Sequence, residues 1–140
     1  SDSDADTQQS DNQSSEESNH SEKVERCFSN IRHGHVDRVF ECFVTMDVNE
    51  RDGYGNTPLI VASQNGMIRI VKHLLRLGAN INAKNSSGQT ALHYTSMYGY
   101  QRLHDYLVRK GANYRIRNNY GETCYDVEKS SYESSDRSSG

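Results

Sequence analysis

The chain has 140 residues, enough for one modest domain, and a net charge of −3 at pH 7. It contains no apolar run long enough for a signal peptide, so no membrane insertion is expected. Its three cysteines are odd in number and lack C-x-x-C spacing, which argues against a disulfide framework and for the cytoplasm or nucleus.

Residues 1–22 form an acidic, serine-rich segment with seven acidic residues, seven serines and no lysine or arginine. Such a composition buries too little apolar surface to offset the entropy of ordering. We therefore expect residues 1–22 and the polar residues 130–140 to be disordered. Three serines beside Glu16 and Glu17 are candidate sites for acid-directed kinases, namely Ser14, Ser15 and Ser18.

The rest of the chain has the opposite charge. Residues 23–128 hold 14 basic and 10 acidic side chains, a balance of +4. Opposite charges on two parts of one chain allow a loose association, screened by salt over about 10 Å. One hypothesis is that the acidic segment competes with acidic partners for the basic body. The simpler alternative is that it is a solubilising linker.

Residues 23–51 show two short apolar stripes at helical spacing. The first consists of Cys27, Phe28 and Ile31, and the second of Val36, Val39, Phe40 and Phe43. His33 and Gly34 separate them. Polar residues such as Lys23 and Glu25 suit an outer face that meets water, as expected at the end of a repeat array. These residues are interpreted as an N-terminal capping unit.

The next unit returns at a fixed interval of 33 residues. The matched residues are Thr57, Leu59, Gly66, Leu74, Gly78, Ala79 and Asn80, followed by Thr90, Leu92, Gly99, Leu107, Gly111, Ala112 and Asn113. Gly55, Gly88 and Gly121 keep the same step, so a further copy begins near the end of the chain. A fixed period of this length is typical of stacked supersecondary units.

Each unit predicts two helices. Thr57 followed by Pro58 is typical of a helix N-cap and first position, and Gly66 ends that helix. A second amphipathic helix then runs from Ile68 to Gly78. The short link makes the two helices antiparallel neighbours, and the turn-rich segment between units predicts a projecting hairpin-like loop.

These residues resemble the ankyrin repeat. The fitting positions are Asp52, Gly55, Thr57, Pro58, Leu59, Ala62, Gly66, Val71, Leu74, Leu75, Gly78, Ala79, Ile81 and Asn82. Departures include Ile60 for the usual histidine, Ala91 for proline, and Thr95 with Ser96 for the alanine pair. The resemblance implies an all-α ankyrin-repeat solenoid of stacked antiparallel helix pairs. Its units would be a cap over 23–51, repeats over 52–84 and 85–117, and a half repeat over 118–129, together the domain 23–129.

No constellation of residues indicates catalysis, a cofactor or a metal. Cys27, His33 and His35 could be metal ligands, but no fourth ligand is spaced to join them. Cys124 has no base evident nearby in sequence, and the glycines are spread singly rather than in a phosphate loop. We therefore expect neither enzyme activity nor a bound cofactor or metal.

The resemblance implies a partner protein bound along the loop tips and the exposed side of the first helices. Carried over residue by residue, this surface comprises Tyr54, Asn56, Gln64, Asn65, Ser87, Gln89, Met97, Tyr98, Tyr120 and Glu122. Arg32 and His33 would extend it. Tyrosine provides broad, stiff contact area with a polar tip, and it often anchors interfaces. The expected function is a monomeric, non-catalytic scaffold or regulatory adaptor.

Two other roles follow from particular residues. A basic group could contact nucleic acid as part of a larger regulatory protein, and it consists of Arg109, Lys110, Arg115 and Arg117. Because residues 23–128 carry a net charge of only +4, we expect a protein partner in preference to nucleic acid. Asn82 and Asn49 occupy the loop position that asparaginyl hydroxylases modify in many ankyrin proteins, so the resemblance implies candidate modification sites there.

Overall fold

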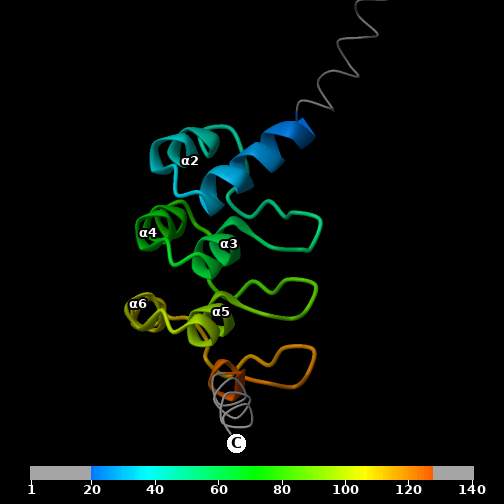
Figure 1. The fold of residues 1–140 in the computed structure, drawn as a ribbon, viewed down its shortest axis with the longest axis vertical. Helices are drawn as coiled ribbons and strands as arrows, with labels where there is room; N and C mark the ends of the chain where they lie inside the picture. The colour runs from blue at the N-terminus through cyan, green and yellow to red at the C-terminus, as the bar shows by residue number, and fades with distance from the viewer. Residues whose placement is uncertain (1–19, 128–140) are drawn as a thin grey trace, which may run out of the picture.

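The computed structural model describes residues 20–127, and every regular element in that range is helical. A first helix covers residues 20–32 and a last helical turn covers 124–127. Between them lie α2 (Val36–Cys42), α3 (Pro58–Gln64), α4 (Ile68–Arg76), α5 (Ala91–Tyr98) and α6 (Gln101–Arg109). Consecutive helices pair, the pairs follow one another along the long axis, and the loops between pairs project to one side (Figure 1). None of the described helices has both the length and the apolar character needed to cross a membrane.

The helix boundaries confirm the predicted caps. The Thr57 hydroxyl accepts a hydrogen bond from the Ile60 N–H at 3.3 Å, and Pro58 takes the first position of α3, where a missing N–H costs nothing. Gly66 follows that helix with φ of +66°, a left-handed conformation that favours glycine. Local chemistry at these residues therefore determines where α3 begins and where the chain turns after it.

The core lies between successive helix pairs. Helix α3 contacts both α4 and α5, and α5 contacts α6. The largest fully buried apolar side chains come from every pair and include Phe28, Ile31, Leu59, Ile70, Leu74, Leu92 and Leu107. Each such side chain contributes about 1.5–3 kcal/mol when removed from water. Because a pair buries part of this surface within itself and part against its neighbours, the units stabilise one another.

The first helix begins earlier than composition suggested. It already includes residues 20–22, which the sequence assigned to the acidic segment. The His20 Nε2 atom lies 3.4 Å from a carboxylate oxygen of Glu50, and this contact joins the helix to the loop that follows α2. The expectations for residues 1–19, including Ser14, Ser15 and Ser18, lie outside the described residues, as do those for 128–140.

His93 connects α5 to the loop that follows α6. The Thr90 N–H donates to His93 Nδ1 at 3.0 Å, so Nδ1 carries no proton and Nε2 is the donor. Nε2 donates to the Glu122 carbonyl at 2.9 Å. The equivalent position one repeat earlier is Ile60, whose buried apolar side chain cannot form such a link.

Acidification should destabilise this fold through its histidines. Burial lowers the pKa of His93 and of His73, and at His73 the nearby Arg76 lowers the pKa further. A lowered folded pKa means that the unfolded chain binds more protons below its own value of about 6.5. The stabilisation is complete above about pH 6.5 and is lost as the pH falls through the folded pKa.

We expect the melting temperature to fall between about pH 7.5 and 5.5. Thermal denaturation followed by circular dichroism at constant ionic strength measures this. The variant His93→Gln, which cannot titrate there, should show a smaller decrease. An equal decrease in melting temperature for the wild type and the variant would show that groups other than His93 cause the pH dependence.

Candidate partner-binding surface

One residue shapes each projecting loop in the same way. The Oδ1 atom of Asp52 accepts the backbone N–H groups of Tyr54 and Asn56, both at 2.9 Å. Asn85 and Asn118, at 33-residue steps, repeat this pattern with the N–H groups two and four residues later. Such bonds close a turn that would otherwise leave polar backbone groups unpaired. The three loops therefore share one conformation.

The loops also bond to one another. The Ser86 N–H donates to the Tyr54 carbonyl at 3.1 Å, and the Asn119 N–H donates to the Ser87 carbonyl at 3.0 Å. The Asn119 side chain adds a bond to the Ser86 carbonyl at 2.8 Å. The projecting loops lie one after another on the same side of the helices (Figure 1). The loop tips form one continuous, pre-organised edge.

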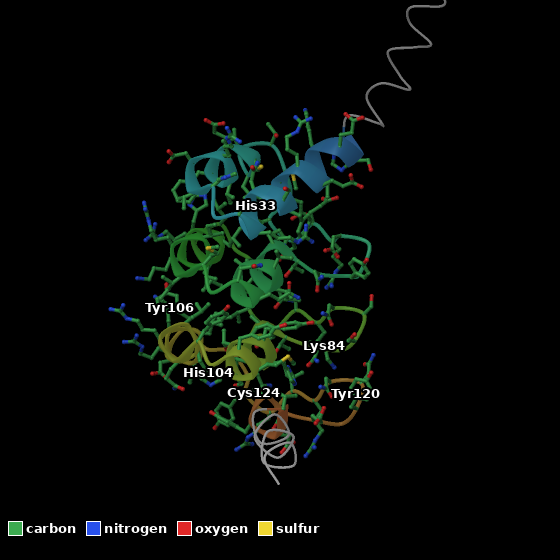
Figure 2. The ribbon with its side chains drawn as sticks, viewed as in Figure 1. His33, Lys84, His104, Tyr106, Tyr120 and Cys124 are labelled. Carbon is green, nitrogen blue, oxygen red and sulfur yellow. The ribbon has the colours of Figure 1, made fainter. Side chains whose placement is uncertain are left out.

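The predicted tyrosine anchors lie on this edge and beside it. Tyr54 is 75% exposed and Tyr120 is 79% exposed, both on loop tips. Figure 2 shows Tyr120 on the last projecting loop. Tyr98, at the end of α5, is 52% exposed and its ring centroid lies 6.2 Å from Tyr94 and 6.0 Å from Tyr100. Tyr98 thus belongs to an aromatic cluster rather than standing alone.

The other predicted surface residues differ in accessibility. Ser87 is exposed, and the half-buried residues are Gln64, Asn65, Gln89, Met97 and Glu122. Asn56 differs from the expectation, because its side chain is only 7% exposed. Its Oδ1 atom accepts from Asn85 at 2.9 Å. The Asn56 side chain therefore belongs to the scaffold that joins neighbouring loops and is not part of the open face.

A cavity of about 810 Å³ lies beside Tyr54, between the first helix and the first projecting loop. Val24 is half-buried beside it and Phe28, only 1% exposed, closes its floor, while Arg32 and Asp52 line it and form a salt bridge at 3.3 Å. Sequence reasoning identified Tyr54 and Arg32 but missed Val24 and Phe28. The first unit matches the repeat poorly, so its sequence pattern predicts a cap and does not indicate that its first helix lines a cavity.

The titratable residues of the first unit form separate contacts. His33 Nδ1 lies 2.8 Å from the Ser29 carbonyl oxygen, and His35 Nδ1 lies 3.2 Å from Asn30 Oδ1. Burial, followed by the neighbouring Cys42, raises the pKa of the Cys27 thiol, so this thiol stays protonated. Within residues 20–127 no three His, Cys, Asp or Glu side chains are placed to hold a metal ion.

The two candidate hydroxylation sites have a structural role. Asn49 Oδ1 accepts from the Asn80 N–H, and Asn82 Oδ1 accepts from the Asn113 N–H, each at 2.8 Å. Each asparagine thereby joins its own turn to the turn of the next unit. Their modification stays a prediction.

The predicted basic group does not converge on one place. Arg117 donates to the Gly121 carbonyl at 2.6 Å and lies 4.0 Å from an Asp126 carboxylate oxygen. The guanidinium of Arg115 lies over the Tyr114 ring. Arg109 ends α6, where a cation complements the helix dipole. Arg109 and Lys110, at the end of α6, line one cavity together.

The comparisons with known proteins agree with this architecture. A family model described as ankyrin repeats (3 copies) matches residues 27–118, which is well over half of the chain. These three copies correspond to the capping unit and the two full repeats that the sequence predicted. A search of curated proteins finds no match. On its helix pairs, its repeated loops and this family match, the chain belongs to the ankyrin-repeat family.

Proposed function

We propose that this chain is a non-catalytic adaptor, a repeat solenoid that binds a partner protein along the loop tips and first helices. Ankyrin repeats are in general protein–protein interaction modules. The observation that carries the proposal is the cavity of about 810 Å³ beside the exposed Tyr54 ring. Its lining combines the apolar Val24 with charged side chains such as Arg32 and Asp52, which suits a partner side chain that has both an apolar and a polar part, with Tyr54 packing beside it.

Pre-organisation supports this role. Hydrogen bonds within and between loops hold the backbone at Tyr54 and Tyr120, so little chain entropy is lost when a partner binds. A tyrosine also orders few rotatable bonds for the area it contributes. The module would act as a monomer in the cytoplasm or nucleus.

Replacing Tyr54, Tyr98 and Tyr120 together by alanine should weaken partner binding by at least about 100-fold, because buried interface tyrosines commonly contribute 1–2 kcal/mol or more each. The test is affinity capture from cell lysate with quantitative mass spectrometry, followed by titration of the captured partner.

A matched control removes exposed apolar side chains elsewhere. Val44→Ala combined with Leu77→Ala alters the ends of second helices, where both residues are exposed. This control should capture the same partner as the wild type. If the control loses the partner as completely as the tyrosine variant, or if the tyrosine variant captures it undiminished, the proposed face is wrong.

A further inference from the structure

The outer helices carry a ring at equivalent positions in two units. His73 on α4 and Tyr106 on α6 are 33 residues apart. The His73 ring stacks on Phe40 of α2, with centroids 3.9 Å apart. The Tyr106 ring instead faces Lys72 of α4, whose Nζ lies 5.2 Å from the ring centroid. Figure 2 places Tyr106 on the side of the helices opposite the projecting loops.

A second ammonium group approaches the same ring. Lys110 Nζ lies 5.6 Å from the Tyr106 centroid. Lys72, Tyr106, Arg109 and Lys110 together line a cavity of about 390 Å³. Within residues 20–127 none of these three cations forms a salt bridge. Cation–π attraction at exposed sites is only about 0.5–1 kcal/mol, so an anion placed among the three charges would add attraction and offset their repulsion.

The extent of the positive charge indicates the size of the ligand. Helices α4 and α6 have nine residues each and are therefore only about 13.5 Å long. The neighbouring α2 exposes Asp37 and Glu41 together with Arg38, so its exposed charges add no net positive charge. A nucleic acid that relies on its backbone needs about 6–10 phosphate contacts for strong binding. This compact site fits one doubly charged group with a short flanking peptide.

We propose that Lys72, Tyr106, Arg109 and Lys110 form a binding site for a phosphorylated side chain in an acidic peptide of a partner protein. A phosphate monoester carries about −1.5 to −2 charges at pH 7 and three acceptor oxygens. The Arg109 guanidinium can bind two of those oxygens side by side, while the ammonium groups of Lys72 and Lys110 approach from two helices. This site is separate from the loop face, so one adaptor could hold two segments at once.

The test is fluorescence anisotropy with the full, unmodified chain. The probe is a labelled ten-residue peptide with the sequence of residues 10–19, SDNQSSEESN, phosphorylated at Ser14. The same peptide without phosphate is the reference. We expect the phosphorylated peptide to bind at least about tenfold more tightly, and inorganic phosphate to compete with it.

Matched variants locate the binding. Lys72→Gln combined with Lys110→Gln should lower the affinity at least about tenfold. Arg69→Gln combined with Arg102→Gln removes the same charge from the exposed faces of the same two helices, outside the cavity, and should change the affinity by less than about threefold. Melting temperatures of both variants are compared to show that the fold is intact.

Three results would overturn the proposal. Equal affinity for the two peptides would remove the role of the phosphate. An equal loss in the two double variants would show general charge attraction without a site. A single-stranded 20-nucleotide DNA that binds more tightly than the phosphopeptide, and loses affinity in the Lys72 and Lys110 variant, would assign the cavity to nucleic acid.

Discussion

Replacing His93 by alanine should lower the free energy of unfolding by about 2–4 kcal/mol. The imidazole is almost fully buried and makes bonds at both nitrogens, to the Thr90 N–H and the Glu122 carbonyl. Its removal leaves the buried Thr90 N–H without its acceptor and opens a space in the core, while the Glu122 carbonyl keeps only the bond from the Asn118 N–H. Urea denaturation should show a lower midpoint with an unchanged slope.

The variant His93→Gln separates the two bonds. A glutamine at the third helical position can accept the N–H of the capping residue, as in a capping box. The glutamine variant should therefore lose less unfolding free energy than the alanine variant. The loss that remains measures the contribution of the bond to the Glu122 carbonyl. An alanine variant as stable as the wild type would show that this connection contributes nothing.

Replacing Gly88 by alanine should lower the free energy of unfolding by about 2–4 kcal/mol. Gly88 has φ of +75°, and an added Cβ would lie 2.5 Å from Asn119 Oδ1 and 2.8 Å from the Asn119 backbone nitrogen. The next loop would have to move away, and the bond from the Asn119 N–H to the Ser87 carbonyl would break. The midpoint of urea denaturation measures this loss.

Gly121→Ala is the matched control. Gly121 has φ of +76°, and a Cβ there would meet no described atom within 4 Å. This control should therefore cost only the left-handed backbone strain of about 1–2 kcal/mol. The difference between the two variants isolates the packing of one loop on the next. Equal losses would mean that this packing does not stabilise the fold.

The helices could be predicted from the sequence because their signals are local. Thr57, Pro58 and Gly66 act through bonds and backbone angles within a few residues, and the structure confirms them. The contacts between units could not be predicted in the same way. A period of 33 shows that Asn56 and Gln89 are equivalent, but not that each accepts a bond from the loop of the next unit, nor that Asn56 is buried while the longer Gln89 is half-buried.

The same reasoning applies to the surfaces. Tyr54 and Tyr120 are exposed as expected, since a loop tip contacts few other groups. The cavity around Tyr106 was missed because Lys72 and Lys110 are 38 residues apart and meet only when α4 and α6 pack side by side. A helical pattern marks both lysines as polar positions, without indicating that they approach one ring.

The hydrogen bond from His93 to the Glu122 carbonyl also makes the junctions between units respond differently to pH. The junction at α5 depends on a proton-binding side chain, whereas the junction at α3 has the inert Ile60 in the same place. Acid adds a proton at His93 Nδ1, which can then no longer accept the Thr90 N–H, whereas the imidazolium still donates from Nε2 to the Glu122 carbonyl. A fall in pH would therefore weaken the cap at the start of α5 while its link to the last loop persists, and the start of α3, with Ile60 in that position, would not respond.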